Sequence, residues 1–163
     1  MLDLIIKNGQ CYINNELKKV DVAIKDGKIQ HIGQITEEAK ETLDVGKQIV
    51  LPGCIDTQTH FREPGSTDTE DLNSGSRAAI VGGITSVFEM PNTNPPTSNK
   101  LEFQKKLDLA KNRMYCNYAF YFGATADNAN ELSDLKDLEG CCGIKLFAGS
   151  STGNLLVADE ADI

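Results

Sequence analysis

The sequence predicts an α/β protein in which a parallel sheet follows a smaller β-rich segment, and two observations support this prediction. From Leu51 onward, short apolar strands alternate with helical segments, which is the pattern of consecutive βα units. Before that point, short apolar runs are divided by Asn-Gly, Asn-Asn and Asp-Gly pairs, which are signals for tight turns between antiparallel strands. We therefore expect a small antiparallel β-layer over residues 1–50 and the α/β part over residues 51–163.

Four strands and three helical segments are expected in the α/β part. The strands are CIDTQTH (54–60), ITSVFEM (84–90), YCNYAFYFG (115–123) and CCGIKLF (141–147), and the helical segments span 69–83, 100–114 and 128–140. The first helix should carry acids in its first turn and end at Gly82-Gly83. In the second helix, Phe103, Leu107, Ala110 and Met114 recur on one face, and Ser98 or Asn99 can cap its start.

In the β-rich segment, Asp26-Gly27 is the strongest hairpin signal, and a further strand pair is expected about Gly46. His31 lies near the end of a strand there, and its pattern favours a solvated or hydrogen-bonded histidine over a metal ligand. No cluster of catalytic residue types occurs in residues 1–50, so we expect the functional site in the α/β part.

Composition excludes several classes of function. The chain is 40% hydrophobic and 25% charged, which is ordinary for a globular domain. A formal net charge of −8 without a basic block argues against binding to nucleic acid or to an anionic membrane surface. The sequence contains neither a long apolar span nor a signal-like start, and its five cysteines lack CxxC spacing. We therefore expect a cytoplasmic protein with reduced, mostly buried thiols.

The first strand of the α/β part ends in a cluster of polar side chains. Asp56, Gln58 and His60 alternate and so share one side of the strand. Two histidines at this spacing can hold one metal ion, but the first position is Gln58, whose neutral amide oxygen suits Mg²⁺ or Ca²⁺ better than Zn²⁺. His60 keeps a good nitrogen ligand, with a hydrogen-bonded structural histidine as the alternative interpretation.

Three further residues are candidates for the same site. The planar guanidinium of Arg62 can bind a substrate carboxylate or pair with Glu63. Asn92, in MPNTNPP, can donate to the same carboxylate or serve the geometry of the turn. Lys145 lies inside an apolar strand, where it can react with CO₂ to form a metal-bridging carbamate or extend to solvent from the strand edge. Because active groups of parallel sheets gather at the C-terminal ends of strands, we expect a polar site at one rim.

Three ordered motifs resemble the amidohydrolase superfamily and, within it, the dihydroorotases. They are VLPGCIDTQTHFREPG, AAIVGGITSVFEMPNTNPPT and GIKLFAGSSTGNLLV, and the similarity extends over the whole chain. HFREPG together with MPNTNPPT favours dihydroorotase over hydantoinases and allantoinases, which share the general plan. The resemblance implies a metal-dependent (β/α)8 TIM barrel flanked by a small β-sandwich. Residues 1–50 would be a segment of the sandwich, and residues 51–163 the first half of the barrel, about four βα units.

The resemblance also implies an activity and roles for residues. The activity is the reversible hydrolysis of dihydroorotate to N-carbamoyl-aspartate in pyrimidine biosynthesis, with one or two zinc ions that activate water. By position, His60 and Gln58 would be metal ligands, and Lys145 would be the carboxylated lysine that bridges the metals. Arg62 and Asn92 would hold the substrate carboxylate. A branch of the dihydroorotases carries Gln at the place of Gln58.

The chain is short for this family, which leaves three hypotheses about its role. A (β/α)8 barrel takes about 250 residues, whereas residues 51–163 number 113 (163 − 50). The family's later histidine ligands and catalytic aspartate have no counterpart, so we expect no complete catalytic set and negligible activity from the chain alone. The chain is then the first part of a dihydroorotase-like enzyme, a non-catalytic structural partner of aspartate transcarbamoylase, or a hydantoinase- or allantoinase-type relative. The expected protein partner is either aspartate transcarbamoylase or further copies of the chain in an oligomer.

Overall fold

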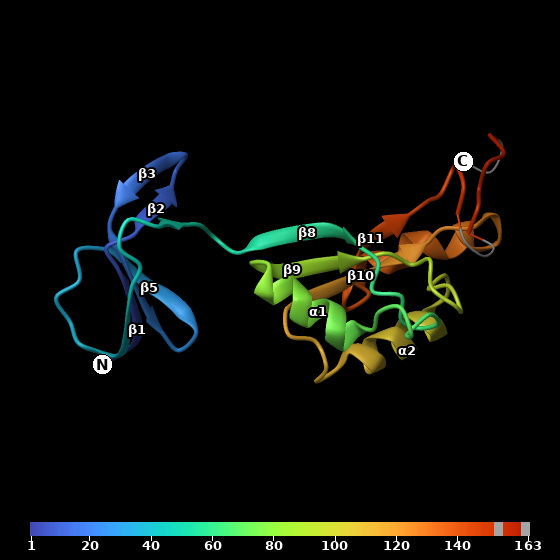
Figure 1. The fold of residues 1–163 in the computed structure, drawn as a ribbon. Helices are drawn as coiled ribbons and strands as arrows, with labels where there is room; N and C mark the ends of the chain where they lie inside the picture. The colour runs from blue at the N-terminus through green and yellow to red at the C-terminus, as the bar shows by residue number, and fades with distance from the viewer. Residues whose placement is uncertain (152–154, 161–163) are drawn as a thin grey trace. The chain divides into compact units, whose positions relative to one another are not determined.

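The computed structural model describes residues 1–151 and 155–160 and divides the chain into two compact units, Met1–Pro52 and Gly53–Ile163 (Figure 1). Each unit contains its own sheets and its own buried apolar cluster. Residues 152–154, which belong to the third sequence motif, lie outside the described residues.

The first unit holds two sheets built from short strands. One contains β1 (Leu2–Lys7), β4 (Asp21–Lys25), β5 (Lys28–Gly33) and β6 (Ala39–Asp44), and the other contains β2 (Gln10–Ile13), β3 (Glu16–Lys19) and β7 (Ile49–Val50). Asn14-Asn15 joins β2 to β3 and Asp26-Gly27 joins β4 to β5, and all four residues have positive φ. These are the two expected tight hairpin turns, because the favoured two-residue turn requires positive φ at both positions.

The expectation of a purely antiparallel layer is wrong for this unit. β1 pairs in parallel with β6, and β2 pairs in parallel with β7. The segments on either side of Gly46 also do not pair with each other, because β6 and β7 join different sheets. Alternation of apolar residues indicates which face of a strand is buried, but it does not specify which neighbour the strand pairs with.

The second unit confirms the predicted α/β fold. β8 (Cys54–Thr59), β9 (Ile84–Glu89), β10 (Asn117–Gly123) and β11 (Cys141–Lys145) form one parallel sheet in the order β11-β10-β9-β8. The connections contain α1 (Leu72–Val81), α2 (Lys100–Ala110) and η1 (Ala126–Asp137), which is a 3₁₀ helix. Neighbours in sequence are therefore neighbours in the sheet, as consecutive βα units require.

The two α-helices of this unit begin at side-chain caps. Asp71 precedes α1 and accepts a hydrogen bond from the Ser74 backbone N–H at 2.6 Å, so the expectation of acids inside the first turn of α1 is wrong. Asn99 caps α2 by accepting from the Glu102 N–H at 2.9 Å, which resolves the choice between Ser98 and Asn99. Such caps satisfy backbone donors that have no partner within the helix.

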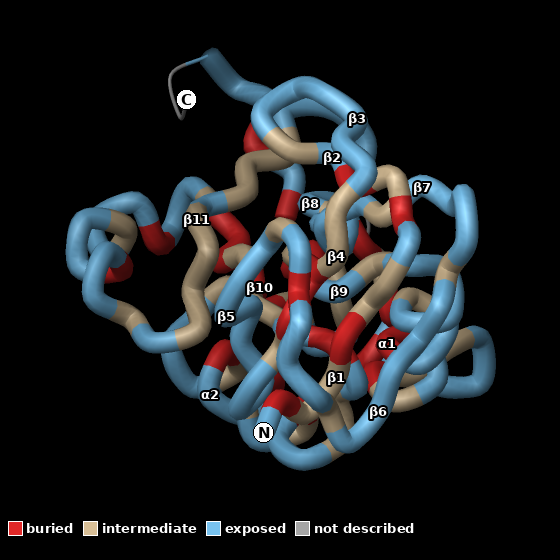
Figure 2. Tube along the Cα trace, turned by 90° about the vertical axis from the view of Figure 1, so that its left-hand side faces the viewer, coloured by how far each residue is buried: buried red, intermediate tan, exposed pale blue. Residues whose placement is uncertain are grey.

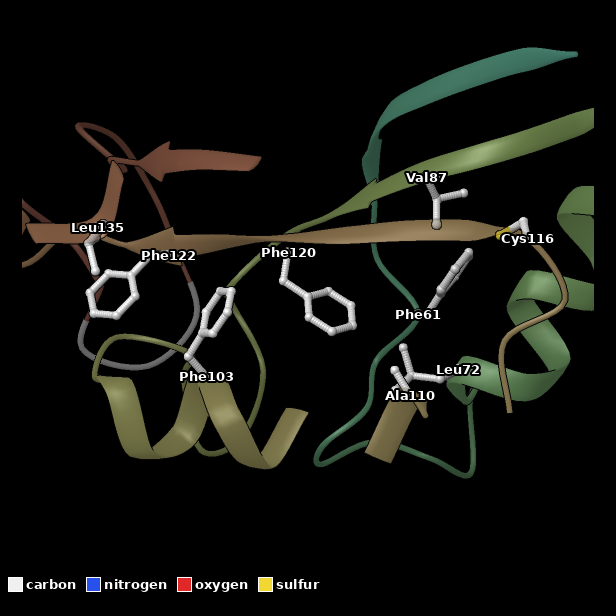
Figure 3. Close-up of a cluster of buried hydrophobic side chains, with 9 residues drawn as sticks. All are labelled: Phe61, Leu72, Val87, Phe103, Ala110, Cys116, Phe120, Phe122 and Leu135. Atoms are coloured by element: carbon white, nitrogen blue, oxygen red, sulfur yellow. The ribbon is translucent and has the colours of Figure 1, made fainter. Parts of the chain in front are cut away.

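A buried apolar cluster lies between the sheet and the two α-helices, which cover the same face of the sheet (Figures 1 and 3). Phe103 and Ala110 of α2 are fully buried, as the helical spacing predicts, and Figure 2 marks such positions in red. The Phe103 ring lies edge-on to Phe120 of β10, with the ring centroids 6.4 Å apart. Burying an aromatic side chain of this size contributes about 1.5–3 kcal/mol, so this cluster fixes α2 beneath the strands.

The apolar character of CCGIKLF favours a buried strand at β11, and this expectation is wrong. None of its residues is buried, and Ile144 remains 46% exposed. The reason is its place in the sheet, because β11 is a terminal strand with one neighbour, β10. Neither α1 nor α2, nor any other helix within residues 1–151 and 155–160, combines the length and apolar character needed to cross a membrane.

Candidate functional site

The candidate site is formed by two loops that follow the C-terminal ends of β8 and β9. The Asn94 N–H donates to the Pro64 carbonyl at 2.9 Å, which joins the two loops directly. Gly65 has φ +121°, and a Cβ placed on it would lie 2.9 Å from the Cβ of Asn94. A side chain at Gly65 would therefore separate the loops, so the Pro-Gly end of the first motif is the surface against which the second motif packs.

Arg62 and Asn92 lie at one cavity between these loops. The cavity has a volume of about 400 Å³ and is lined by Arg62, Pro64, Ser66, Asn92, Thr93, Asn94 and Pro96. Arg62 is exposed and adopts a left-handed conformation with φ 62°, and its carbonyl accepts from the Ser66 N–H at 2.9 Å. The structure thus brings together the two residues that the sequence nominates for binding a carboxylate.

Two threonines that no sequence motif singles out organise the loop that carries Asn92. Thr93 Oγ1 donates to the Pro95 carbonyl at 2.8 Å and lies 3.2 Å from Thr97 Oγ1. The backbone N–H groups of Thr93 and Thr97 both donate to the Pro91 carbonyl at 2.9 Å. The turn chemistry that was the alternative role for Asn92 is therefore supplied largely by threonine, a residue known to form such local hydrogen bonds.

His60 lies directly beside the cavity residues. Its imidazole is half-buried and its side chain hydrogen-bonds with that of Asn92. Partial burial and the positive charge of Arg62 lower the pKa of His60, and the hydrogen bond with Asn92 opposes this shift. His60, Arg62 and Asn92 therefore form one polar group at the ends of β8 and β9.

The other two residues expected to bind metal are less closely associated with this group. The Gln58 side chain is exposed, and its backbone N–H donates to Asp56 Oδ1 at 2.9 Å. Lys145 ends β11, which is separated from β8 by the two strands β10 and β9, and its Nζ lies 5.0 Å from the centroid of the Phe147 ring. Its charge still contributes to lowering the pKa of His60.

The described residues do not supply a complete metal site. Within residues 1–151 and 155–160, no group of three or more His, Cys, Asp or Glu side chains could hold a metal ion. A zinc site requires at least three protein ligands even when one position is left open for water. Of the three predicted metal ligands, His60 is therefore the only strong one among the described residues. The other two predicted ligands are Gln58 and Lys145.

Glu63, which the sequence offers as an ion-pair partner for Arg62, pairs instead with Arg113. The two Arg113 Nη atoms lie 2.8 and 3.0 Å from the Glu63 carboxylate oxygens, so the pair is bidentate. The same carboxylate accepts from the Leu72 N–H at 2.9 Å, in the first turn of α1. Glu63 therefore ties the loop after β8 to α1 and to the segment that follows α2.

A second buried ion pair lies beneath the site and was missed in the sequence. Lys106 of α2 pairs with Glu89 at the end of β9, and both side chains are buried, at 0% and 1% exposure. Lys106 Nζ also donates to the Met90 carbonyl at 3.0 Å and lies 5.0 Å from the centroid of the Phe120 ring. Burial raises the pKa of Glu89 and lowers that of Lys106, and the opposite charge of the partner counteracts each shift.

A signal for this pair is present in the sequence. Lys106 follows Phe103 by three residues and precedes Ala110 by four, so it belongs to the apolar face of α2. Glu89 follows Val87 by two residues and therefore shares the buried side of β9. Two opposite charges at positions that the periodicity assigns to the core indicate that the charges pair with each other.

Comparison with known proteins identifies a family and several of its members. The profile of the amidohydrolase family matches residues 49–145. Proteins named allantoinase from Escherichia coli O1:K1 and from Escherichia coli strain SMS-3-5 are 40% and 41% identical to this chain over 162 residues, which is 99% of it. The chain covers 36% of the length of those relatives.

Solved structures with similar folds come from hydantoinases. An L-hydantoinase (dihydropyrimidinase) from Arthrobacter aurescens matches 96% of this chain with a TM-score of 0.87 and 31% identity. A D-hydantoinase (dihydropyrimidinase) from a Thermus species matches 98% of it with a TM-score of 0.78 and 26% identity. The match covers 35% of the first of these chains and 36% of the second.

Proposed function

Because this chain belongs to the amidohydrolase family, we propose that it provides the substrate-binding side of a cyclic amidohydrolase of the allantoinase and hydantoinase type. The observation that carries the proposal is the cavity at which Arg62 and Asn92 meet, beside His60. The relatives favour this type over dihydroorotase, which the motifs alone favoured. A TIM-barrel context for the second unit, with residues 1–50 as a β-sandwich segment and 51–163 as the first half of the barrel, is part of the same proposal.

The proposed reaction opens a cyclic ureide. The oxygen of a water molecule bonds to a ring carbonyl carbon, the carbon–nitrogen bond breaks, and the nitrogen leaves with a proton, so that a carboxylate and a ureido group result. Arg62 presents a planar set of donors that matches a carboxylate, and Asn92 adds an amide. Together they would orient the ring before the reaction and hold the carboxylate afterwards.

Members of this superfamily are generally metal-dependent, and the proposal includes a metal. Zinc would polarise the ring carbonyl and lower the pKa of a bound water. His60 would be a ligand, Gln58 a weak oxygen donor and Lys145 a carboxylated bridging residue. The described residues supply only part of such a site, so we expect negligible turnover from this chain alone. Metal analysis of the wild type and of His60→Ala tests the assignment, and equal metal contents would refute His60 as a ligand.

Calorimetric titration of the 163-residue chain tests ligand binding. The probes are hydantoin, allantoin, dihydroorotate and N-carbamoylglycine, which is the ring-opened form of hydantoin. We expect hydantoin, its ring-opened form or allantoin to bind most tightly. Arg62→Met should weaken that binding about tenfold or more, because a charged hydrogen bond is lost. The matched control is Arg77→Met, which removes an exposed arginine on α1.

Three outcomes would contradict this proposal. If none of the probes binds, or if Arg62→Met binds as tightly as wild type, the cavity is not the ureide site. If dihydroorotate binds most tightly, the dihydroorotase interpretation replaces this one. The hypothesis of a structural partnership with aspartate transcarbamoylase then also has to be considered again.

A further inference from the structure

The backbone on both sides of His60 is held by hydrogen bonds to β9 and to the residue that follows it. Before it, the Thr59 carbonyl accepts from the Met90 N–H at 3.0 Å. After it, the Phe61 N–H donates to Glu89 Oε1 at 3.1 Å. His60 therefore projects from a short segment whose two ends are both bonded to β9 or to the residue that follows β9.

The side chain of Phe61 anchors the same segment from below. Its ring belongs to the apolar cluster between the sheet and the helices (Figure 3), and it is 7% exposed. It lies against α1 so closely that a Cβ at Gly75 would be 2.4 Å from Phe61 Cδ1. With its ring packed and its N–H bonded to Glu89, Phe61 fixes the direction of the residues on either side, His60 and Arg62.

Lys106 holds the backbone of the second loop, which follows β9, in the same way. Its Nζ contacts the Glu89 carboxylate and donates to the Met90 carbonyl at 3.0 Å, two residues before Asn92. One buried ion pair therefore bonds to the backbone of both loops, next to His60 and Arg62 in the first and close to Asn92 in the second. These two hydrogen bonds satisfy buried charged groups and also hold the backbone of both loops.

We propose that Glu89 and Lys106 are positioning residues, which hold the loops after β8 and β9 so that Arg62 and Asn92 meet at one cavity with His60 beside it. This inference rests on the proposed function for the identity of the ligand, and on the hydrogen bonds above for the positioning itself. Because the pair is buried, water does not compete with its bonds to the two loops, and a small change in it would move the groups at the cavity.

Two substitutions at Glu89 separate positioning from charge neutralisation. Glu89→Gln and Glu89→Leu both remove the negative charge opposite Lys106, but only Gln retains an oxygen that can accept from the Phe61 N–H. We expect Glu89→Gln to bind the probe of the calorimetric series within about threefold of wild type, and Glu89→Leu to bind it about tenfold or more weakly. Lys105→Met, an exposed neighbour on α2, is the control.

Nuclear magnetic resonance supplies a readout that does not depend on ligand binding. The chain has two histidines, His31 in the first unit and His60, so the ring signals are readily distinguished. In Glu89→Leu we expect the signals of the His60 ring and the Asn92 side-chain amide to shift and broaden, while those of His31 stay unchanged. Glu89→Gln should resemble wild type. Unchanged His31 signals show that the first unit is folded, and well-dispersed backbone amide signals from β10 show that the second unit is folded.

The possible outcomes are distinct. If both Glu89 variants disturb His60 and Asn92 equally, or if neither does, the positioning role is wrong and the pair only neutralises buried charge. If no probe binds to wild type, the proposed function fails, and the His60 and Asn92 signals still decide whether the pair positions them. Should Glu89→Leu not fold, Lys106→Met is compared in its place, with the Asn92 amide as the reporter of the lost bond to Met90.

Discussion

Arg62 and Glu63 are adjacent in the sequence and have opposite environments. Arg62 is exposed at the cavity, whereas Glu63 is 7% exposed, binds Arg113 through both oxygens and accepts from the Leu72 N–H. The left-handed backbone at Arg62 turns the chain between them. The comparison shows that charges close in sequence need not pair, and that one motif can contain both a ligand-binding residue and a structural residue.

The same contrast separates two sets of side chains in the second unit. The cavity group, His60, Arg62 and Asn92, is half-buried or exposed and free to meet a ligand. The supporting charges lie beneath or beside it in two ion pairs, Glu63–Arg113 and Glu89–Lys106. If this division is correct, substitutions in the supporting charges should change stability, and those at Arg62 should change binding.

The largest effect is expected at Lys106. Lys106→Met should lower the free energy of unfolding by about 3 kcal/mol, because breaking a buried ion pair leaves the other charge without compensation. Urea denaturation measures this, with Lys105→Met as a surface control expected to change stability by less than about 0.5 kcal/mol. A loss below about 1 kcal/mol in Lys106→Met would show that the pair contributes little to the fold.

The Lys106→Met variant should also acquire a pH dependence. Burial already raises the pKa of Glu89 above its ordinary value, and removing the ammonium group raises it further. A carboxyl group whose pKa is higher in the folded state favours folding at low pH, and this contribution is lost as the pH rises through the folded pKa. The variant should therefore be less destabilised at pH 5 than at pH 8, and a larger loss at pH 5 would contradict this.

The next effect directly tests the contrast between Arg62 and Glu63. Glu63→Gln should lower the free energy of unfolding by about 2 kcal/mol, because a largely buried carboxylate loses charged hydrogen bonds. Arg62→Met should change it by less than about 0.5 kcal/mol, as expected for an exposed residue. Both variants are measured by urea denaturation. Equal losses of stability would support the Arg62–Glu63 ion pair that the sequence suggested.

A smaller effect is expected at the start of α2, which carries Lys106. Asn99→Ala should lower the free energy of unfolding by about 1 kcal/mol, because the Glu102 N–H loses the side-chain oxygen that caps the helix. Asn99→Asp keeps that acceptor and should retain most of the wild-type stability in the same urea experiment. If Asn99→Ala is as stable as wild type, the cap does not contribute to the placement of α2.

The smallest effect is a change in acid sensitivity at the start of α1. Hydrogen bonds from Ser74 lower the pKa of Asp71 below its ordinary value. The stabilisation from this carboxylate is present above its unfolded pKa of about 3.9 and is lost as the pH falls through the lower folded pKa. Asp71→Asn keeps a capping oxygen without the titration, so its stability should fall less steeply below pH 4. An unchanged acid unfolding profile would exclude the carboxylate as a contributor.

The sequence predicted those features that depend on local pattern. The βα alternation, the hairpin turn at Asp26-Gly27 and a cap at Ser98 or Asn99 follow from spacing and residue type, and the structure selects Asn99. Arg62 and Asn92 were nominated separately and share a cavity because each follows the end of one of two neighbouring parallel strands.

The remaining features depend on contacts between distant segments. The parallel pairing of β1 with β6 could not be predicted, because an apolar pattern does not encode its partner strand. The Glu63–Arg113 pair joins residues fifty positions apart, and no local spacing relates them. The exposure of β11 follows from its place at the end of the sheet, which the apolar character of CCGIKLF does not reveal.

The most direct test of the division between the cavity group and the supporting charges is to map where a ligand binds. The isotope-labelled 163-residue chain is titrated with hydantoin and N-carbamoylglycine while backbone and side-chain amide signals are followed by nuclear magnetic resonance. We predict that the largest shifts occur at Arg62, Asn92 and Thr93. The opposite result is an absence of shifts there, or the largest shifts at the separate cavity of about 510 Å³ that includes Lys111 and Tyr118.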